Sequence, residues 1–275
     1  MKTANRKIFG KKASQAVIIA AMVAIASPVL FAGQASAFDP KQVFKEEKPS
    51  AKKLFSFYLS KKKQGKDDEA LDVLEYAAGQ GNSTAQWKLG NMYQLGDSVG
   101  RDPAKAFKFY QQIANRYGDA RPNTPEWAIT GKAMVALGNY YRDGLPEANV
   151  AKDGNEARVM YTTAAMYFRD PDGQFELARL ILQGGGSFEE GRQAIRMLQL
   201  ADRKGHPGAM ALLGSTLVEG EYVIQDVVLG LTMLTKAANQ ATPDMLPWIQ
   251  NLQQEAFALA TPEQREQAIK NASGN

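Results

Sequence analysis

One pattern of apolar, small and polar positions recurs along the chain, and it is clearest between Ala85 and Ala114. A Leu-Gly pair is followed by a Tyr and a second Gly, and then by an Asp, an Ala and a second Tyr. The first two copies are Leu89, Gly90, Tyr93, Gly96, Asp102, Ala106, Tyr110, and Leu137, Gly138, Tyr141, Gly144, Asp153, Ala157, Tyr161. Two altered copies are Leu177, Ala178, Ile181, Gly184, Glu190, Ala194, Leu198, and Leu213, Gly214, Leu217, Gly220, Asp226, Gly230, Leu234. Because the spacing is helical and the copies lie 48, 40 and 36 residues apart, the pattern predicts an all-α solenoid of paired helices.

The small residue beside each anchor leucine indicates how the paired helices pack. Glycine within a helix costs roughly 0.5 to 1 kcal/mol relative to alanine, so its recurrence predicts helices that approach closely there. Gly96 is expected to end a first helix and Asp102 to cap a second. The structural anchors are therefore expected to be Leu89, Gly90, Tyr93, Gly96, Leu137, Gly138, Tyr141, Gly144, Leu213 and Gly214. Repeat 3 lacks the first-helix Gly and Tyr, and repeat 4 has Gly230 in place of Ala, which should weaken both repeats.

The first 37 residues have the composition of a secretory signal peptide. Five basic residues precede an apolar run from Ala16 to Phe31, and the segment ends in Ala35-Ser36-Ala37. We predict cleavage after Ala37 and export to the periplasm. A membrane anchor is the alternative, but the run is shorter than the roughly 20 residues that span a bilayer.

The rest of the chain divides by composition into four parts. Residues 38–50 contain two prolines and clustered charge, which predicts an extended, protease-accessible leader. Residues 51–80 predict a helical pair similar to a tetratricopeptide unit, and residues 81–242 contain the four repeats. Residues 243–275 predict helices that cap the exposed end of the array.

Charge and cysteine content exclude several classes of function. The signal segment holds five of the 33 Lys and Arg residues and no acidic residue, so the remainder carries 28 basic against 29 acidic residues. The basic character of the whole chain is therefore no evidence for nucleic-acid binding. Because the chain has no Cys, it can form neither disulfides nor thiolate metal sites.

No arrangement of residues marks a catalytic centre, a cofactor site or a metal site. His206 is the only histidine, and we interpret it as a loop residue between two repeats. The turn Gly184-Gly185-Gly186 lacks the Lys-Ser/Thr sequence of a phosphate loop. We predict that the protein is not an enzyme and binds no cofactor.

The repeat Ala-x-x-x-Leu-Gly-x-x-Tyr-x-x-Gly, followed by Asp-x-x-Lys-Ala-x-x-x-Tyr, resembles the Sel1-like repeat, a relative of the tetratricopeptide repeat. Together with Phe38–Pro40, Gly205–Ala211 and Gln254–Phe257, the chain resembles the exopolysaccharide production negative regulators (ExoR-like) of Gram-negative bacteria. The resemblance implies a periplasmic inhibitor of a two-component sensor kinase. It also implies that the inhibitor binds the sensing domain of the kinase and is removed by a protease, often on acidification.

If the helices stack as in tetratricopeptide arrays, the positions two and five after each anchor leucine point into a concave face. These positions hold Asn91 and Gln94, Asn139 and Arg142, Arg179 and Leu182, Ser215 and Val218. Asn and Arg can bind a peptide backbone or a carboxylate, so the partner-binding residues are expected to be Asn91, Gln94, Asn139, Arg142 and Arg179. Ordinary solvated polar surface is the competing interpretation, and the insertion from Arg121 to Trp127 is a second candidate surface.

Two other functions stay open at this level. The chain could be a cell-envelope scaffold without a signalling role, or a β-lactamase-like enzyme, as some secreted Sel1 proteins were named. Those enzymes are rich in Cys, which this chain lacks. The sequence does not identify the kinase, the protease, the regulated genes or the oligomeric state.

Overall fold

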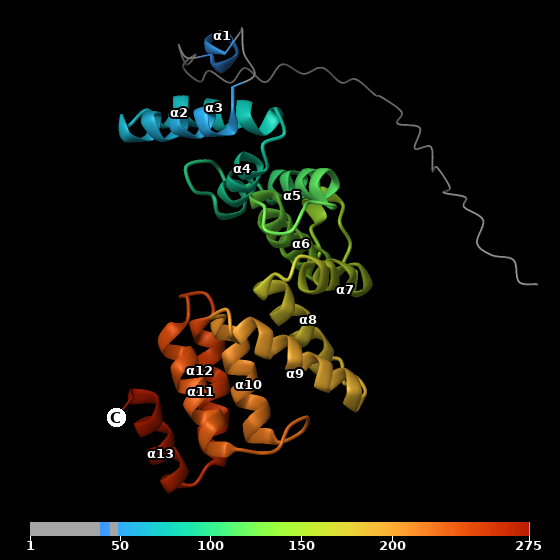
Figure 1. Ribbon diagram of the computed structural model, residues 1–275, viewed down its shortest axis with the longest axis vertical. Helices are drawn as coiled ribbons and strands as arrows, with labels where there is room; N and C mark the ends of the chain where they lie inside the picture. The colour runs from blue at the N-terminus through green and yellow to red at the C-terminus, as the bar shows by residue number, and fades with distance from the viewer. Residues whose placement is uncertain (1–38, 45–48, 275) are drawn as a thin grey trace, which may run out of the picture. The chain divides into compact units, whose positions relative to one another are not determined.

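The computed structural model describes residues 39–44 and 49–274, which belong to one compact unit, Phe38–Asn275. The predicted signal peptide and its cleavage after Ala37 lie outside the described residues. The helices, shown in Figure 1, are α1 (Pro40–Val43), α2 (Ala51–Lys63), α3 (Asp67–Gly79), α4 (Ser83–Leu95), α5 (Pro103–Tyr117), α6 (Pro125–Asp143), α7 (Gly154–Thr162), α8 (Pro171–Gln183), α9 (Phe188–Asp202), α10 (Pro207–Glu219), α11 (Val227–Gln240), α12 (Leu246–Leu259) and α13 (Pro262–Ser273). A 3₁₀ turn, η1 (Pro146–Ala148), and a π-helical turn, η2 (Thr163–Tyr167), complete them.

The apolar core is a series of clusters that follow one another along the chain. Successive clusters centre on Leu89, Tyr110, Tyr161 and Leu234, and each is built by helices that are neighbours in sequence. Each repeat therefore buries its apolar face against the next one, as in a solenoid. This arrangement confirms the predicted all-α fold class.

The helices of each pair touch where the sequence has a small residue after the anchor leucine. A Cβ atom on Gly90 would lie 2.6 Å from Cε1 of Tyr110, and one on Gly138 would lie 2.5 Å from Cε1 of Tyr161. The tyrosine ring of the second helix thus occupies the space that a side chain would take. The anchor leucines beside these glycines, Leu89 and Leu137, are buried.

Repeat 4 reaches the same close packing by a different route. A Cβ atom on Gly230 would lie 2.5 Å from the carbonyl oxygen of Gly214, because the backbones of α10 and α11 meet there. The substitution of Gly for Ala, which we expected to weaken this repeat, lets the two helices approach. In repeat 3, Ala178 and Leu198 fill the equivalent space, and both are fully buried.

Most helix ends follow the sequence signals. The side chain of Asp102 accepts a hydrogen bond from the backbone N–H of Lys105, and Gly96 ends α4 in the left-handed conformation. The third repeat differs, since its cap is Ser187. Glu190, which aligns with Asp102, instead completes the capping box three residues later.

Two segments differ from the predicted extended or irregular structure. In the leader, Asp39 caps the one-turn helix α1, and Phe44 is buried against Phe57 and Tyr76. In the insertion, Pro125 begins α6, because proline is tolerated at the first position of a helix. Trp127 is therefore helical, and its ring centroid lies 6.0 Å from that of Phe168.

Candidate functional site

The predicted partner-binding residues of repeats 1 and 2 surround the hydroxyl groups of two buried tyrosines. The hydroxyl of Tyr110 lies 2.7 Å from Oδ1 of Asn91 and 2.7 Å from Oε1 of Gln94. In repeat 2, the hydroxyl of Tyr161 donates to Oδ1 of Asn139 over 2.7 Å. The positions two and five after the anchor leucine are three residues apart, so they lie on the same face of the first helix. In both repeats this face meets the tyrosine on the second helix of the pair.

Burial keeps both tyrosines in the neutral, donating form. It raises the pKa of Tyr110 and of Tyr161, and Glu176 raises the pKa of Tyr161 further. A neutral hydroxyl has one proton to donate. At Tyr161 the carbonyl oxygen of Asn139 accepts it, whereas at Tyr110 only one of the two amides, Asn91 or Gln94, can accept it. The amide nitrogens of Asn91 and Asn139 have no hydrogen-bond partner among the described residues. These N–H groups remain as donors at the half-buried edge of the helix pair.

Repeats 3 and 4 have apolar residues in place of the tyrosine and of the polar residue five positions after the anchor leucine, while Arg179 and Ser215 keep the position two after it polar. Leu198 and Leu234 take the place of the tyrosines, and Leu182 and Val218 replace the polar residue five positions after the anchor. A polar side chain five positions after the anchor leucine would have no tyrosine hydroxyl to face in these two repeats. Repeats that have the tyrosine also have a polar residue five positions after the anchor leucine, and repeats without the tyrosine do not. This correlation between two positions of the sequence indicates which polar residues face a tyrosine.

Repeats 2 and 3 are joined by an ionic cluster. Oε2 of Glu176 lies 3.2 Å from Nη1 of Arg142 and 2.5 Å from Nη2 of Arg179. Arg142 also donates to both oxygens of Asp143, at 2.9 and 2.8 Å, and to the hydroxyl of Tyr161 at 3.2 Å. The hydrogen bond from Arg142 lowers the pKa of Asp143. The structure thus brings Asn139, Arg142 and Arg179 together, whereas Asn91 and Gln94 gather separately at Tyr110.

The cluster changes the expected charge of this surface. Two arginines face two carboxylates, so the positive charge of the arginines is compensated locally. Glu176 is the residue that sequence reasoning missed. Glu176 precedes Arg179 by three residues, a spacing at which ion pairs commonly form on a helix. The sequence does not show that the fold also brings Arg142 to the same carboxylate.

The insertion lies beside a second surface feature. Its residues and those of η2 line a hollow of about 620 Å³. Met166 and Tyr167 of η2 are exposed, and Arg169 and Lys204 supply positive charge. The residues that line the hollow are Pro122, Asn123, Trp127, Met166, Tyr167, Arg169, Pro171 and Lys204.

His206 has a defined structural role at the boundary of repeats 3 and 4. It is buried, its Nδ1 accepts a hydrogen bond from the backbone N–H of Ala209 over 3.0 Å, and its Nε2 lies 3.2 Å from Oδ1 of Asp172. The ring packs on Phe175 with centroids 4.6 Å apart. The histidine lies in the connection between α9 and α10, as expected, and there it caps α10. The following Pro207 at the first helical position is the sequence signal for this cap.

Neither metal clusters nor membrane spans are found in the part of the chain that the structure describes. Within residues 39–44 and 49–274, no group of three or more His, Asp or Glu side chains is arranged to hold a metal ion. In the same residues, no helix is both long and apolar enough to cross a bilayer.

Comparison with known proteins supports the repeat assignment. Residues 83–117, 131–166, 171–206 and 207–241 match the Sel1 repeat. The chain is 38% identical over 239 residues to the exopolysaccharide production negative regulator of Rhizobium meliloti, covering 86% of each chain. It is 35% identical over 248 residues to the protein of that name from Rhizobium leguminosarum bv. viciae, covering 90% of each.

A solved structure has the same fold. The Sel1 repeat protein from Oxalobacter formigenes superposes with a TM-score of 0.57 at 20% identity, over 85% of this chain and 92% of that chain. This likeness supports the solenoid architecture alone.

Proposed function

Because the chain belongs to the Sel1-repeat family and to its group of exopolysaccharide production negative regulators, we propose that it restrains exopolysaccharide production by binding another protein in the periplasm. The partner in this proposal is the sensing domain of a two-component sensor kinase, which the bound protein holds inactive. A periplasmic protease removes the regulator and releases the kinase.

The observation that carries the proposal is the similarity to two regulators over nearly the whole chain, at 38% and 35% identity. Sel1 repeats provide the means of protein binding, since stacked helix pairs offer an extended surface to a partner segment. Export follows from the predicted signal peptide, which places the protein on the side of the membrane where a sensing domain lies.

We propose that the partner contacts the polar edge formed by Asn91, Gln94, Asn139, Arg142 and Arg179. The amide oxygen of Asn139 accepts from the hydroxyl of Tyr161, so its N–H groups are available to a backbone carbonyl of a partner. The amides of Asn91 and Gln94 share the hydroxyl of Tyr110, so one of the two can offer its N–H groups in the same way. The two arginines share Glu176, and a partner carboxylate could compete for them. Specific recognition would then combine two contributions. The amides of repeats 1 and 2 would bind the partner's backbone, and a carboxylate of the partner would replace Glu176 at the two arginines.

Degradation is proposed to begin in the leader, residues 38–50, or in the insertion Arg121–Trp127, because proteases cleave exposed backbone that can be extended. Cleavage in the leader would require α1 and the buried Phe44 to unpack first. Arg121, Pro122 and Asn123 are exposed between α5 and α6.

A deletion strain of the producing bacterium tests the function directly. Loss of the protein should raise exopolysaccharide output, and the complete gene should restore the low level. Recovery of the protein from the periplasmic fraction with Phe38 as its first residue would support export. A scaffold without a signalling role predicts unchanged output and capture of cell-wall proteins instead of a sensor domain on pull-down from envelope extract.

A further inference from the structure

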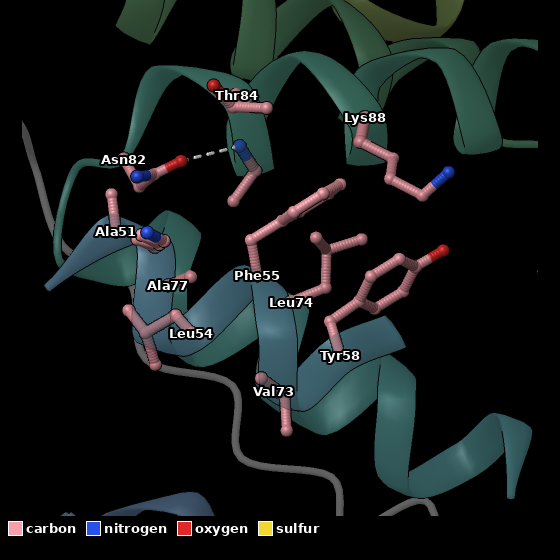
Figure 2. A pocket seen from close by; sticks show the side chains of 12 residues that line it. Ala51, Leu54, Phe55, Tyr58, Val73, Leu74, Ala77, Asn82, Thr84 and Lys88 are labelled. Carbon is pink, nitrogen blue, oxygen red and sulfur yellow. Dashed lines mark hydrogen bonds between the residues drawn. The ribbon is translucent and has the colours of Figure 1, made fainter. Parts of the chain in front are cut away.

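An apolar groove lies between the N-terminal helix pair and the first repeat (Figure 2). Its volume is about 240 Å³, and α2, α3 and α4 supply its walls. Leu54, Tyr58, Val73 and Leu74 form the floor and are buried. The aromatic ring of Phe55 projects over the groove from α2, while Lys88 reaches in from α4.

Two large apolar side chains at and beside the groove are exposed. Phe55 is 45% exposed, and Leu59, one helical turn further along α2, is 42% exposed. Together they form an apolar strip along α2 beside the groove. Contiguous apolar surface of this kind marks binding sites more often than single exposed side chains do.

The charged residues at the groove are all cationic. Lys52 and Lys88 line it, and no Asp or Glu does. Nζ of Lys88 lies 5.3 Å from the ring centroid of Tyr58, and neither lysine has a carboxylate partner among the described residues. The opposite end of α2 differs, because Lys62 pairs with Asp67 and Lys61 pairs with Glu69. No carboxylate of residues 39–44 and 49–274 pairs with the lysines of the groove.

The chain's own first residues are a poor match for this site. Residues 1–38 contain an apolar run, but their charged residues are five Lys and Arg and no Asp or Glu. Like charges across an interface are unfavourable, so the lysines of the groove disfavour this segment.

We propose that this groove docks an amphipathic helix of a partner protein, one with an apolar face and acidic residues at both ends of that face. The apolar face covers Phe55 and Leu59, and the acidic residues meet Lys52 and Lys88. The proposal rests on the proposed function insofar as that function requires a protein partner. It adds a surface separate from the polar edge around Tyr110 and Tyr161.

Two synthetic helical peptides of about 16 residues test the proposal, since helix-in-groove binding uses anchors three and four residues apart. Both carry leucines on one face, and they differ only in having Glu or Lys at the two ends. Fluorescence anisotropy measures their binding to the complete chain and to a chain that begins at Phe38. The Glu peptide should bind both chains about tenfold more tightly than the Lys peptide, because rim charges set such preferences.

Matched variants locate the binding. Phe55→Ala should weaken the Glu peptide about tenfold, and Lys88→Glu should abolish or reverse the preference for Glu over Lys ends. Leu259→Ala and Lys236→Glu, which change exposed positions in α12 and α11, should leave both affinities unchanged. Thermal melting confirms that each variant is folded.

Three results would overturn the proposal: no binding of either peptide, equal binding of both, or Glu-peptide binding that Phe55→Ala leaves intact in a folded protein. Binding only to the chain that begins at Phe38 would also overturn it, because residues 1–37 would then occupy the groove. The proposed function is judged separately by binding of the sensor domain. If the domain binds and the peptides do not, the groove alone is wrong. If the peptides bind and the domain does not, the groove stands and the kinase is not the partner.

Discussion

The hydroxyl of Tyr161 in α7 lies 2.7 Å from Oδ1 of Asn139 in α6, and the same hydroxyl accepts a hydrogen bond from Arg142 at 3.2 Å. One buried ring therefore holds two of the proposed partner-binding side chains in place. The hydroxyl of Tyr110 likewise lies between two polar side chains, 2.7 Å from an oxygen of Asn91 and 2.7 Å from an oxygen of Gln94. The tyrosines link the packing of each repeat to the orientation of its polar edge.

Tyr161→Phe removes this link and keeps the ring. We expect a loss of about 1 kcal/mol in the free energy of unfolding, because a hydrogen bond is lost while half-buried Asn139 and Arg142 can still be hydrated. Urea denaturation followed by circular dichroism measures the change. Tyr167→Phe is the control, since Tyr167 is 49% exposed and its hydroxyl has no hydrogen-bond partner among the described residues. An equal change in both variants would contradict the assigned role.

Gly138→Ala tests the close approach of α6 and α7. The new methyl group would meet the ring of Tyr161 at 2.5 Å, so this buried ring or one of the two helices must shift. Overpacking of this kind costs about 1 to 3 kcal/mol, which outweighs the gain in helix propensity. Thermal melting measures the loss.

Gly79→Ala provides a matched control for that glycine. Gly79 is also helical, but a Cβ atom there would have no neighbour within 4 Å. This variant should be neutral, or more stable by up to about 1 kcal/mol. If Gly138→Ala behaved like Gly79→Ala, the small residue after the anchor leucine would not serve helix packing.

The periodic part of the fold could be predicted from the sequence because its signals are local. Glycine at positions 90 and 138 indicates close contact with the second helix of the same repeat. Asp102 and Asp153 cap the helices that follow them. These signals depend on spacing within one repeat, which the sequence displays directly. The same holds for the exchange of tyrosine for leucine in repeats 3 and 4.

The candidate site was less predictable because it depends on contacts between helices and between repeats. Spacing indicated that Asn139 and Arg142 share a face, but it did not show that Tyr161 would bind both. The shared carboxylate of Glu176 comes from the next repeat. The intervals between repeats vary, so the sequence does not determine which residues meet across that boundary.

The acid response of the purified protein is a third prediction. The hydrogen bond from His206 lowers the pKa of Asp172 below its ordinary value of 3.8, so the contribution of this carboxylate to stability is lost only as the pH falls below that value. Burial raises the pKa of Asp170, and protonation of a buried carboxyl favours the folded state as the pH falls. Neither carboxylate therefore predicts unfolding between pH 7 and about 5, the range in which histidine ordinarily titrates.

Circular dichroism between pH 7 and about 5 tests this expectation. No cooperative transition should appear, so an acid response in the cell would arise in the protease or the kinase. Two variants separate the role of the helix cap from that of the imidazole. His206→Asn removes the imidazole but keeps a good capping residue, whereas His206→Gln removes both. A cooperative transition in the native protein that His206→Gln removes would place the response in this chain.

The double variant Arg142→Ala, Arg179→Ala tests where the partner binds. The two guanidinium groups come from successive repeats and meet at Glu176, so a partner carboxylate that reaches this point can contact both. Their removal should weaken binding of the purified sensor domain about tenfold or more, because contacts of arginine with a carboxylate at the centre of an interface commonly cost over 1 kcal/mol to lose. Surface plasmon resonance with the immobilised sensor domain measures the affinity.

Folding should change much less, because the arginine side chains are 34% and 24% exposed and the remaining carboxylates can be hydrated. A second double variant, Arg158→Ala, Arg196→Ala, removes two arginines that are half exposed and pair with Glu190 and Glu189. It should leave the affinity unchanged and thereby control for net charge. If the Arg142, Arg179 variant is folded and binds the sensor domain as tightly as the native protein, the polar edge is not the binding site. The insertion from Arg121 to Trp127, with the exposed Met166 and Tyr167 beside it, then becomes the surface to mutate next.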